Sequence, residues 1–185
     1  MPGHPVFRRA ALAAAAAQVI LSIPPVAHAQ HASDTLRSRI PASIRAEHEE
    51  IHDELARTAK LAGRTGVAAR ALETLLQPHF EREEQIALPP LSMLGPLARG
   101  EKSATPAWLL PMTDSLRREL PRMLREHVAI RAATQTLATA ARAEGQTSAA
   151  RFAEKLAMHA RSEEEVLYPA AVVAGELARA RRARP

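Results

Sequence analysis

Cysteine is absent from this chain of 185 residues, and aromatic residues make up only 3% of it. Without cysteine, the protein can form neither a disulfide framework nor a thiolate metal site. Strands of alternating valine, isoleucine and threonine are also missing, and so is a glycine-rich phosphate loop. Alanine and leucine dominate instead, and this composition predicts an all-α protein whose length suits one domain.

The first 29 residues have the pattern of a secretory signal peptide. Arg8 and Arg9 precede an apolar run, and a small-x-small cleavage site ends at Ala29. We therefore expect residues 1–29 to be removed and residues 30–185 to form the mature domain, in the periplasm or outside the cell. The apolar run is too short for stable membrane insertion. The sequence leaves Sec and twin-arginine export open, although the arginine pair fits the second signal poorly.

Positive charge is concentrated at the C-terminal end. Removal of the signal peptide takes away two arginines and no acid, so the formal net charge falls from +5 to +3. Arginines occupy positions 179, 181, 182 and 184. The rest of the mature chain is nearly neutral, so we expect no nucleic-acid partner. We interpret the arginine run as a solvated end of the chain.

Hydrophobic periodicity predicts four helices. They are expected to begin near residues 41–43, 67, 113 and 147, and prolines at 78, 121 and 169 are expected to kink three of them. The proline-rich stretch 89–111 excludes a continuous helix and marks a long connection, on which we expect Trp108 and its two following leucines to cover one end of the core. Four helices with one long connection in the middle predict an up-down-up-down four-helix bundle.

Two copies of one motif lie in the second and fourth predicted helices. The segment HFEREEQIALP at 79–89 recurs 80 residues later as HARSEEEVLYP at 159–169. In each copy a histidine, and a glutamate four residues on, stand on the apolar stripe where leucine is expected. The apolar stripe of the fourth helix is predicted to continue through Val166. One copy could arise by chance, but two copies indicate a site.

Each of the other two helices carries a histidine on its own apolar stripe. Glu47-His48 is echoed by Glu126-His127, and each histidine is followed by isoleucine three residues on. The mature domain therefore reads as a fused pair of helical hairpins. Each hairpin contributes one lone histidine and one His-x-x-x-Glu pair.

This pattern predicts a metal site inside the bundle. Residues four apart share one face of a helix, so each His-x-x-x-Glu pair directs a nitrogen and an oxygen to the same point. The candidate ligands are His48, His79, Glu83, His127, His159 and Glu163. Burying these groups without partners is costly, and two divalent metals bridged by the carboxylates, iron or manganese, would compensate them. The competing interpretation is hydrogen-bonded core histidines beside solvated glutamate runs.

Three neighbouring residues are alternative ligands. His52 lies one turn after His48, so it can supply a further donor or support that histidine from outside. Glu84 or Glu164 replaces the glutamate before it if a helical bulge ahead of the next proline rotates the ligand by one residue.

These motifs resemble those of the hemerythrin-like (HHE cation-binding) family, over roughly residues 40–175. The resemblance implies a four-helix bundle around a non-haem centre of two iron ions that binds O2 or a related small molecule. It also implies that Glu83 and Glu163 bridge the ions and that the four histidines are terminal ligands. One position departs from the oxygen carriers, which have a further histidine where this chain has Arg131. The site therefore resembles the bacterial variants with four histidines and two glutamates, in which one coordination position is open.

The sequence leaves three classes of function open. The favoured class is a module that binds or senses O2, NO or peroxide, because of the open coordination position. The second is an enzyme that consumes peroxide, oxidises iron or repairs iron centres, although the Glu-x-x-His spacing of ferritin-like enzymes occurs only at Glu49 and His52. The third is a structural bundle that holds one inert metal. No protein partner or oligomeric state is indicated.

Overall fold

A computed structural model describes residues 35–101 and 105–183, and within these residues the chain is helical and has no strand. The prediction of an all-α protein is therefore confirmed. The predicted signal peptide and Arg184 lie outside the described residues. None of the helices that are described is long and apolar enough to cross a membrane.

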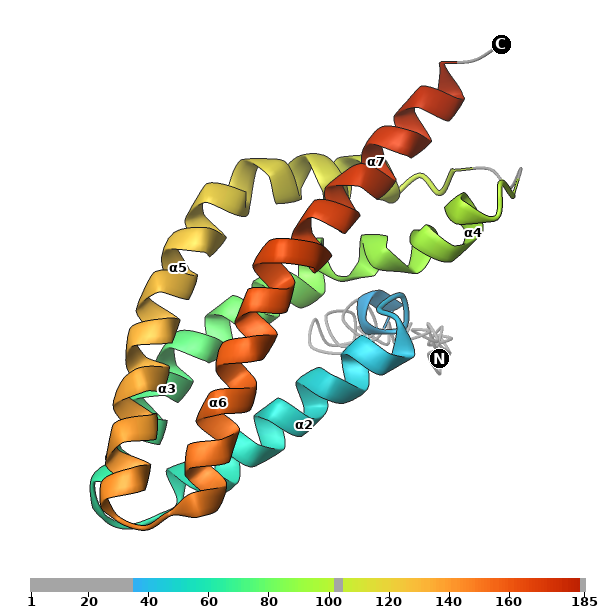
Figure 1. Ribbon diagram of the computed structural model, residues 1–185. Coiled ribbons are helices and arrows are strands. Elements are labelled where there is room, and N and C mark those ends of the chain that lie inside the picture. Colours follow the sequence, from blue (N-terminus) through green and yellow to red (C-terminus); the bar gives the residue numbers. More distant parts are fainter. Residues whose placement is uncertain (1–34, 102–104, 184–185) are drawn as a thin grey trace, which may run out of the picture.

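Four long helices form the bundle: α2 (Ala42–Ala59), α3 (Gly63–Arg82), α5 (Leu109–Ala143) and α6 (Thr147–Ser162). Contacts join α2 to α3, α3 to α5, α5 to α6 and α6 to α2, which closes the bundle. The two short turns lie together at one end, and the long connection crosses at the other (Figure 1). This is the predicted up-down-up-down order.

The long connection contains only short helical pieces. A 3-10 helix, η2 (Pro89–Met93), is followed by α4 (Leu94–Ala98) and by irregular chain. Trp108 is half-buried and stacks on the Arg39 guanidinium, whose carbon lies 5.0 Å from the ring centroid, while Leu109 is fully buried. Helix α5 begins about one turn before the predicted start. The reason is Pro111, which falls in the first turn, where a missing N–H costs no helical hydrogen bond.

Two helices widen into π-helical turns just before a proline. These segments are η1 (Glu83–Ala87) and η3 (Glu163–Leu167), and α7 (Tyr168–Arg182) continues directly from the second. Proline has no N–H, so the carbonyl four residues earlier loses its helical partner, and the chain bonds instead over five residues. The extra residue changes which side chains face inward. Val166, expected on the apolar stripe, is 57% exposed for this reason.

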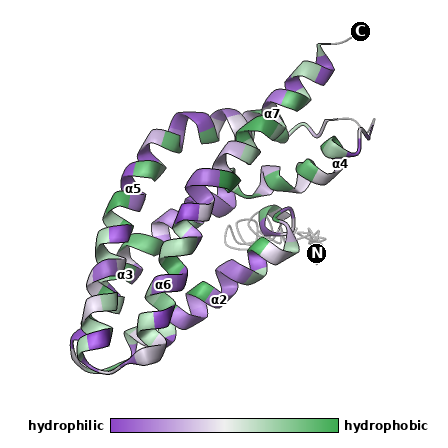
Figure 2. Cartoon of the chain, viewed as in Figure 1, coloured by the Kyte–Doolittle hydropathy of each residue, from purple (hydrophilic) through white to green (hydrophobic). Residues whose placement is uncertain are grey.

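Beside a small cluster of Ala141, Ala149 and Ala150, the apolar core has two large clusters. One contains Leu72, Leu76 and Ile130 near the short turns, and the other contains Leu116 and Met123 towards the long connection. Hydrophobic and hydrophilic residues are interspersed along every long helix (Figure 2). Leu75 and Leu124 are 39% and 38% exposed. Each is adjacent in sequence to a fully buried residue, and adjacent helix positions point about 100° apart.

The turn between α2 and α3 is tighter than predicted. Helix α2 ends at Ala59, and α3 begins at Gly63, which has a φ of 75°. Gly66, just before the start predicted for this helix, lies within α3, where a Cβ would stand 1.7 Å from the Leu61 carbonyl oxygen. Glu144, from the end of α5, accepts hydrogen bonds from two backbone N–H groups of the first turn of α3, at 2.7 and 2.9 Å. This carboxylate therefore caps α3 from the second hairpin.

The C-terminal arginines are bound to the rest of the fold. Arg179 pairs with Asp114 of α5 at 2.5 Å, and Arg181 donates to the Leu97 carbonyl of α4 at 2.7 Å. Arg182 donates to the Thr105 carbonyl at 3.1 Å. Arg179 and Arg182 are exposed, as a solvated run would be, but helix α7 extends far enough for the run to contact α4 and the start of α5.

Candidate metal centre

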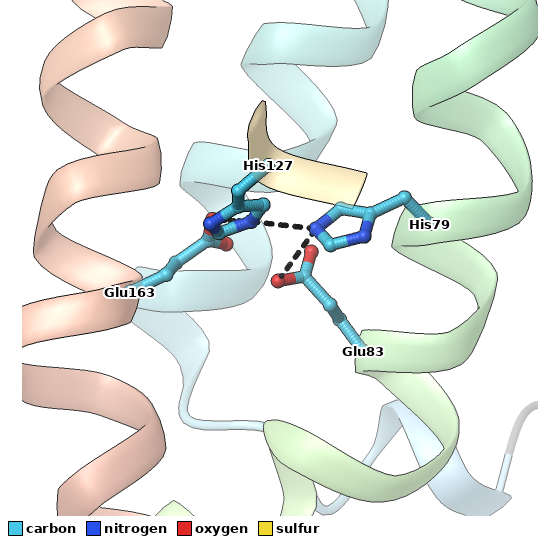
Figure 3. A group of neighbouring side chains, drawn as sticks. All are labelled: His79, Glu83, His127 and Glu163. Atoms are coloured by element: carbon cyan, nitrogen blue, oxygen red, sulfur yellow. Dashed lines mark hydrogen bonds and ion pairs between the residues drawn. The ribbon is translucent and has the colours of Figure 1, made fainter. Parts of the chain in front are cut away.

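All six candidate ligands lie in one layer between the two apolar clusters. The layer forms because each of α2, α3, α5 and α6 carries a histidine on its inner face at the same height in the bundle. The side chains concerned are His48, His79, Glu83, His127, His159 and Glu163, and none is more than 4% exposed. Four of them converge from three helices in Figure 3.

Their donor atoms form two groups that share a carboxylate. The first group contains His79, Glu83, His127 and Glu163, and the second contains His48, His159 and Glu163; in each, the donor atoms lie within 4.8 Å of one another. The second oxygen of Glu83 also lies 4.0 Å from His48 Nε2. Both glutamates therefore stand between the two histidine pairs.

Short contacts hold the first group together. The Nε2 atoms of His79 and His127 are 2.7 Å apart. His79 Nε2 lies 3.4 Å from a Glu83 oxygen, and His127 Nε2 lies 3.5 Å from a Glu163 oxygen. Two imidazole nitrogens and two carboxylates thus surround one small volume.

The second group contains buried polar atoms without hydrogen bonds. His159 Nε2 lies 2.8 Å and His48 Nε2 lies 3.5 Å from the same Glu163 oxygen, yet among the described residues none of these three atoms makes a hydrogen bond. Glu83 Oε2 makes no hydrogen bond either. Buried polar groups are normally satisfied, and a metal ion would satisfy these four atoms at once. The donor set therefore fits a metal.

The opposite nitrogen of each histidine faces a carboxylate from a neighbouring helix. The four Nδ1 pairs are His79 with Glu126 at 3.0 Å, His127 with Glu164 at 2.8 Å, His159 with Glu47 at 3.1 Å and His48 with Glu84 at 3.9 Å. A carboxylate at Nδ1 favours the tautomer whose Nε2 lone pair is free to bind a metal. The four contacts form a closed ring around the bundle, from α2 to α6, α5, α3 and back.

The structure also places the alternative ligands. Glu84 and Glu164 belong to this outer ring and lie outside both donor groups. Each π-helical turn begins at Glu83 or Glu163, so the bulge follows the inward glutamate and leaves it facing the site. His52 is exposed and rests its ring on Phe80, with centroids 4.8 Å apart.

The buried histidines and glutamates of the site have shifted pKa values, and the two glutamates shift in opposite directions. Burial lowers the pKa of His79, but hydrogen bonding to Glu83 and Glu126 raises it more, to about 9. Burial likewise lowers the pKa of His159, and Glu163 raises it to about 9. Burial and the charge of Glu163 raise the pKa of Glu83. Burial raises the pKa of Glu163 too, but its close polar contacts with His127, His159 and His48 lower it well below its usual value.

Tyr168 is a member of the site to which the sequence analysis gave no role. Its side chain is 1% exposed, and its hydroxyl donates a hydrogen bond to Glu83 Oε1. The Tyr168 hydroxyl oxygen also lies 3.2 Å from His127 Nε2 and 3.4 Å from His79 Nε2. Burial, then the charges of the two glutamates, raise the pKa of this phenol. The sequence held one sign of this role: the two motif copies differ here, with Tyr168 in the second where the first has Leu88.

Comparison with known proteins agrees with this site. The family model of the hemerythrin HHE cation binding domain matches residues 39–171, and the chain belongs to this family. No curated protein and no solved structure matches the chain. Family membership and the buried histidines and glutamates together identify a metal-binding domain.

Proposed function

We propose that this protein binds two iron ions in the bundle core and takes up O2 or a related small molecule, such as NO or peroxide. One ion is held by His79 and His127 and the other by His48 and His159. The inward glutamates of the two His-x-x-x-Glu motifs bridge them. The N-terminal pattern supports a further proposal, that the protein works in the periplasm or outside the cell.

The buried polar atoms that make no hydrogen bond support this proposal. Two imidazole nitrogens and two carboxylate oxygens lie together without hydrogen bonds in the described part of the chain. A protein interior rarely leaves so many polar groups unsatisfied, and several uncompensated groups would cost a large part of the stability of a domain this size. Imidazole and carboxylate donors without thiolate suit iron or manganese better than soft metals.

The surroundings of the site favour a small ligand. Bound iron would supply a redox-active centre that attracts O2 and similar molecules. The apolar clusters on both sides of the layer keep bulk water away from it, and the outer carboxylates hold the four imidazole rings in place. The residues of the chain therefore bind and orient the ions and limit access to them.

Metal content and colour test the proposal. Protein loaded with iron(II) under anaerobic conditions should hold two irons per chain and develop ferric absorption in the visible range when oxygen is admitted. Glu163→Gln should lower the iron content. Glu165→Gln is the matched control, because this exposed glutamate lies two residues away in the same acidic run. A colourless protein that retains a single zinc ion would overturn the proposal.

A further inference from the structure

We propose that the phenol oxygen of Tyr168 is an additional ligand to the ion held by His79 and His127, so that the two ions have different donor sets. This inference rests on the proposed di-iron site and adds a ligand to it. The ion held by His48 and His159 has no such phenol donor among the described residues.

Distances to the neighbouring donors support the assignment. Ligands at right angles on a six-coordinate ion, with bonds of about 2.1 Å, lie about 3.0 Å from one another. The phenol oxygen lies 3.2 Å from His127 Nε2 and 3.4 Å from His79 Nε2, and it contacts Glu83 Oε1 directly. It therefore stands near ligand spacing from the two imidazole nitrogens that the proposed function assigns to this ion.

Hydrogen bonding alone does not account for this position. A phenol held only by Glu83 would need no approach to the two imidazole nitrogens. Once each of those nitrogens gives its single lone pair to a metal, only the Glu83 oxygen is left to accept from the buried hydroxyl. The ion then offers the phenol oxygen a second partner in place of the two imidazoles. Coordination replaces the phenol O–H bond with a metal–oxygen bond and releases the proton to solvent.

The π-helical turn aims this side chain. In a regular α-helix, residues five apart point about 140° away from each other, so Tyr168 would not share a face with Glu163. The wider turn over Glu163–Leu167 brings residues five apart nearly into line. Tyr168 is therefore buried in the site layer.

The two motif copies differ at the position of Tyr168, so only one of the two ions can have a phenol ligand. The repeat at an offset of 80 preserves the histidine, both glutamates and the proline, but pairs Tyr168 with Leu88. Both residues are buried and follow a π-helical turn. Leucine cannot donate to a metal, so only one half of the site gains a phenol.

Spectroscopy tests the assignment directly, because Tyr168 is the only tyrosine in the chain and cysteine is absent. Iron-loaded protein oxidised with ferricyanide should show a visible phenolate-to-iron(III) charge-transfer band and tyrosine ring modes in its resonance Raman spectrum. Tyr168→Phe should lose both signals and keep both iron ions. An unchanged spectrum in that variant, or iron-loaded wild type without phenolate ring modes, would overturn the inference.

A second variant separates ligation from packing. Phe152→Leu disturbs a buried aromatic residue of the other apolar cluster and should keep the phenolate band. Iron content keeps the two proposals apart. Failure of the wild type to bind iron removes the proposed function, whereas two bound irons without a phenolate band remove only the role of Tyr168.

Discussion

At the scale of single residues, we expect protonation of His79 and His159 to control metal binding. Their pKa values lie near 9 in the folded protein without metal, above the usual 6.5, so they are protonated at neutral pH. In the metal-free protein, the stability from these protonated contacts is complete below pH 6.5 and is lost as the pH rises through 9.

Because metal must displace these protons, metal affinity should rise between pH 6.5 and 9, by up to about tenfold per pH unit for each proton released. Competition between the protein and a chelating dye for manganese(II) across this range measures the effect. An affinity that does not depend on pH would mean that both imidazoles are neutral before the metal arrives.

The outer carboxylates offer a second test at this scale. Glu126 accepts from His79 Nδ1 and is itself held by Arg82 at 2.7 Å. Its replacement by glutamine should weaken metal binding by about 10–100-fold, as loss of such supporting partners typically does. The same dye competition measures this change. Glu119→Gln serves as the control, since this glutamate is 40% exposed and touches none of the site histidines.

At the scale of helices, close packing of α7 on α5 sets a limit on side-chain size. A Cβ added at Gly175 would lie 2.3 Å from the Thr113 hydroxyl oxygen, and Thr113 is buried. Gly175→Ala should therefore reduce the free energy of unfolding by about 1–3 kcal/mol, the usual range for overpacking. Urea denaturation measures the loss. Thr113→Ala in the same chain should recover part of it, and additive losses would place the strain elsewhere.

Capping of α3 by Glu144 predicts a response to acid. Hydrogen bonds from the Thr65 hydroxyl, the Thr65 N–H and the Arg64 N–H lower the pKa of this carboxyl to about 2. Its contribution to stability is therefore present above the ordinary pKa of 4.5 and is lost as the pH falls towards 2. Glu144→Gln should lower the thermal midpoint at pH 7 and narrow the difference between pH 7 and pH 3. An identical pH profile in circular-dichroism melts would exclude this cap as the acid-sensitive contact.

Helix boundaries and the π-helical turns mark what the sequence could not predict. Periodicity identified four helices and brought six candidate ligands together, because a three- and four-residue spacing holds along any regular helix. Periodicity placed Val166 inward and gave Tyr168 no role. The outward position of Val166 and the inward position of Tyr168 both result from the one extra residue in the π-helical turn. A bulge ahead of Pro169 was one of the alternatives that the sequence allowed, but proline predicts equally a kink or a helix end. Contacts between helices decide among these outcomes.

At the scale of the whole molecule, metal should contribute much of the stability. Free metal at about 1,000 times its Kd adds about 4 kcal/mol, which corresponds to a rise of about 8–16 °C in the thermal midpoint for a domain of this size. Melting of the holo and chelator-treated protein measures the difference. His159→Ala should abolish most of it and His52→Ala should not, since His52 lies outside the donor groups. Equal midpoints for holo and apo protein would contradict a buried metal.

The ring of histidine–carboxylate pairs has one further consequence. Glu84 pairs with His48 inside the first hairpin and Glu164 pairs with His127 inside the second, while the other two pairs cross between the hairpins. Each hairpin therefore holds half of an arrangement with approximate two-fold symmetry, like one subunit of a homodimer. Two copies of the first hairpin would supply the same histidines and glutamates, but leucine in both places that correspond to Tyr168. Fusion into one chain is what allows a single phenol to make the two halves of the site unequal.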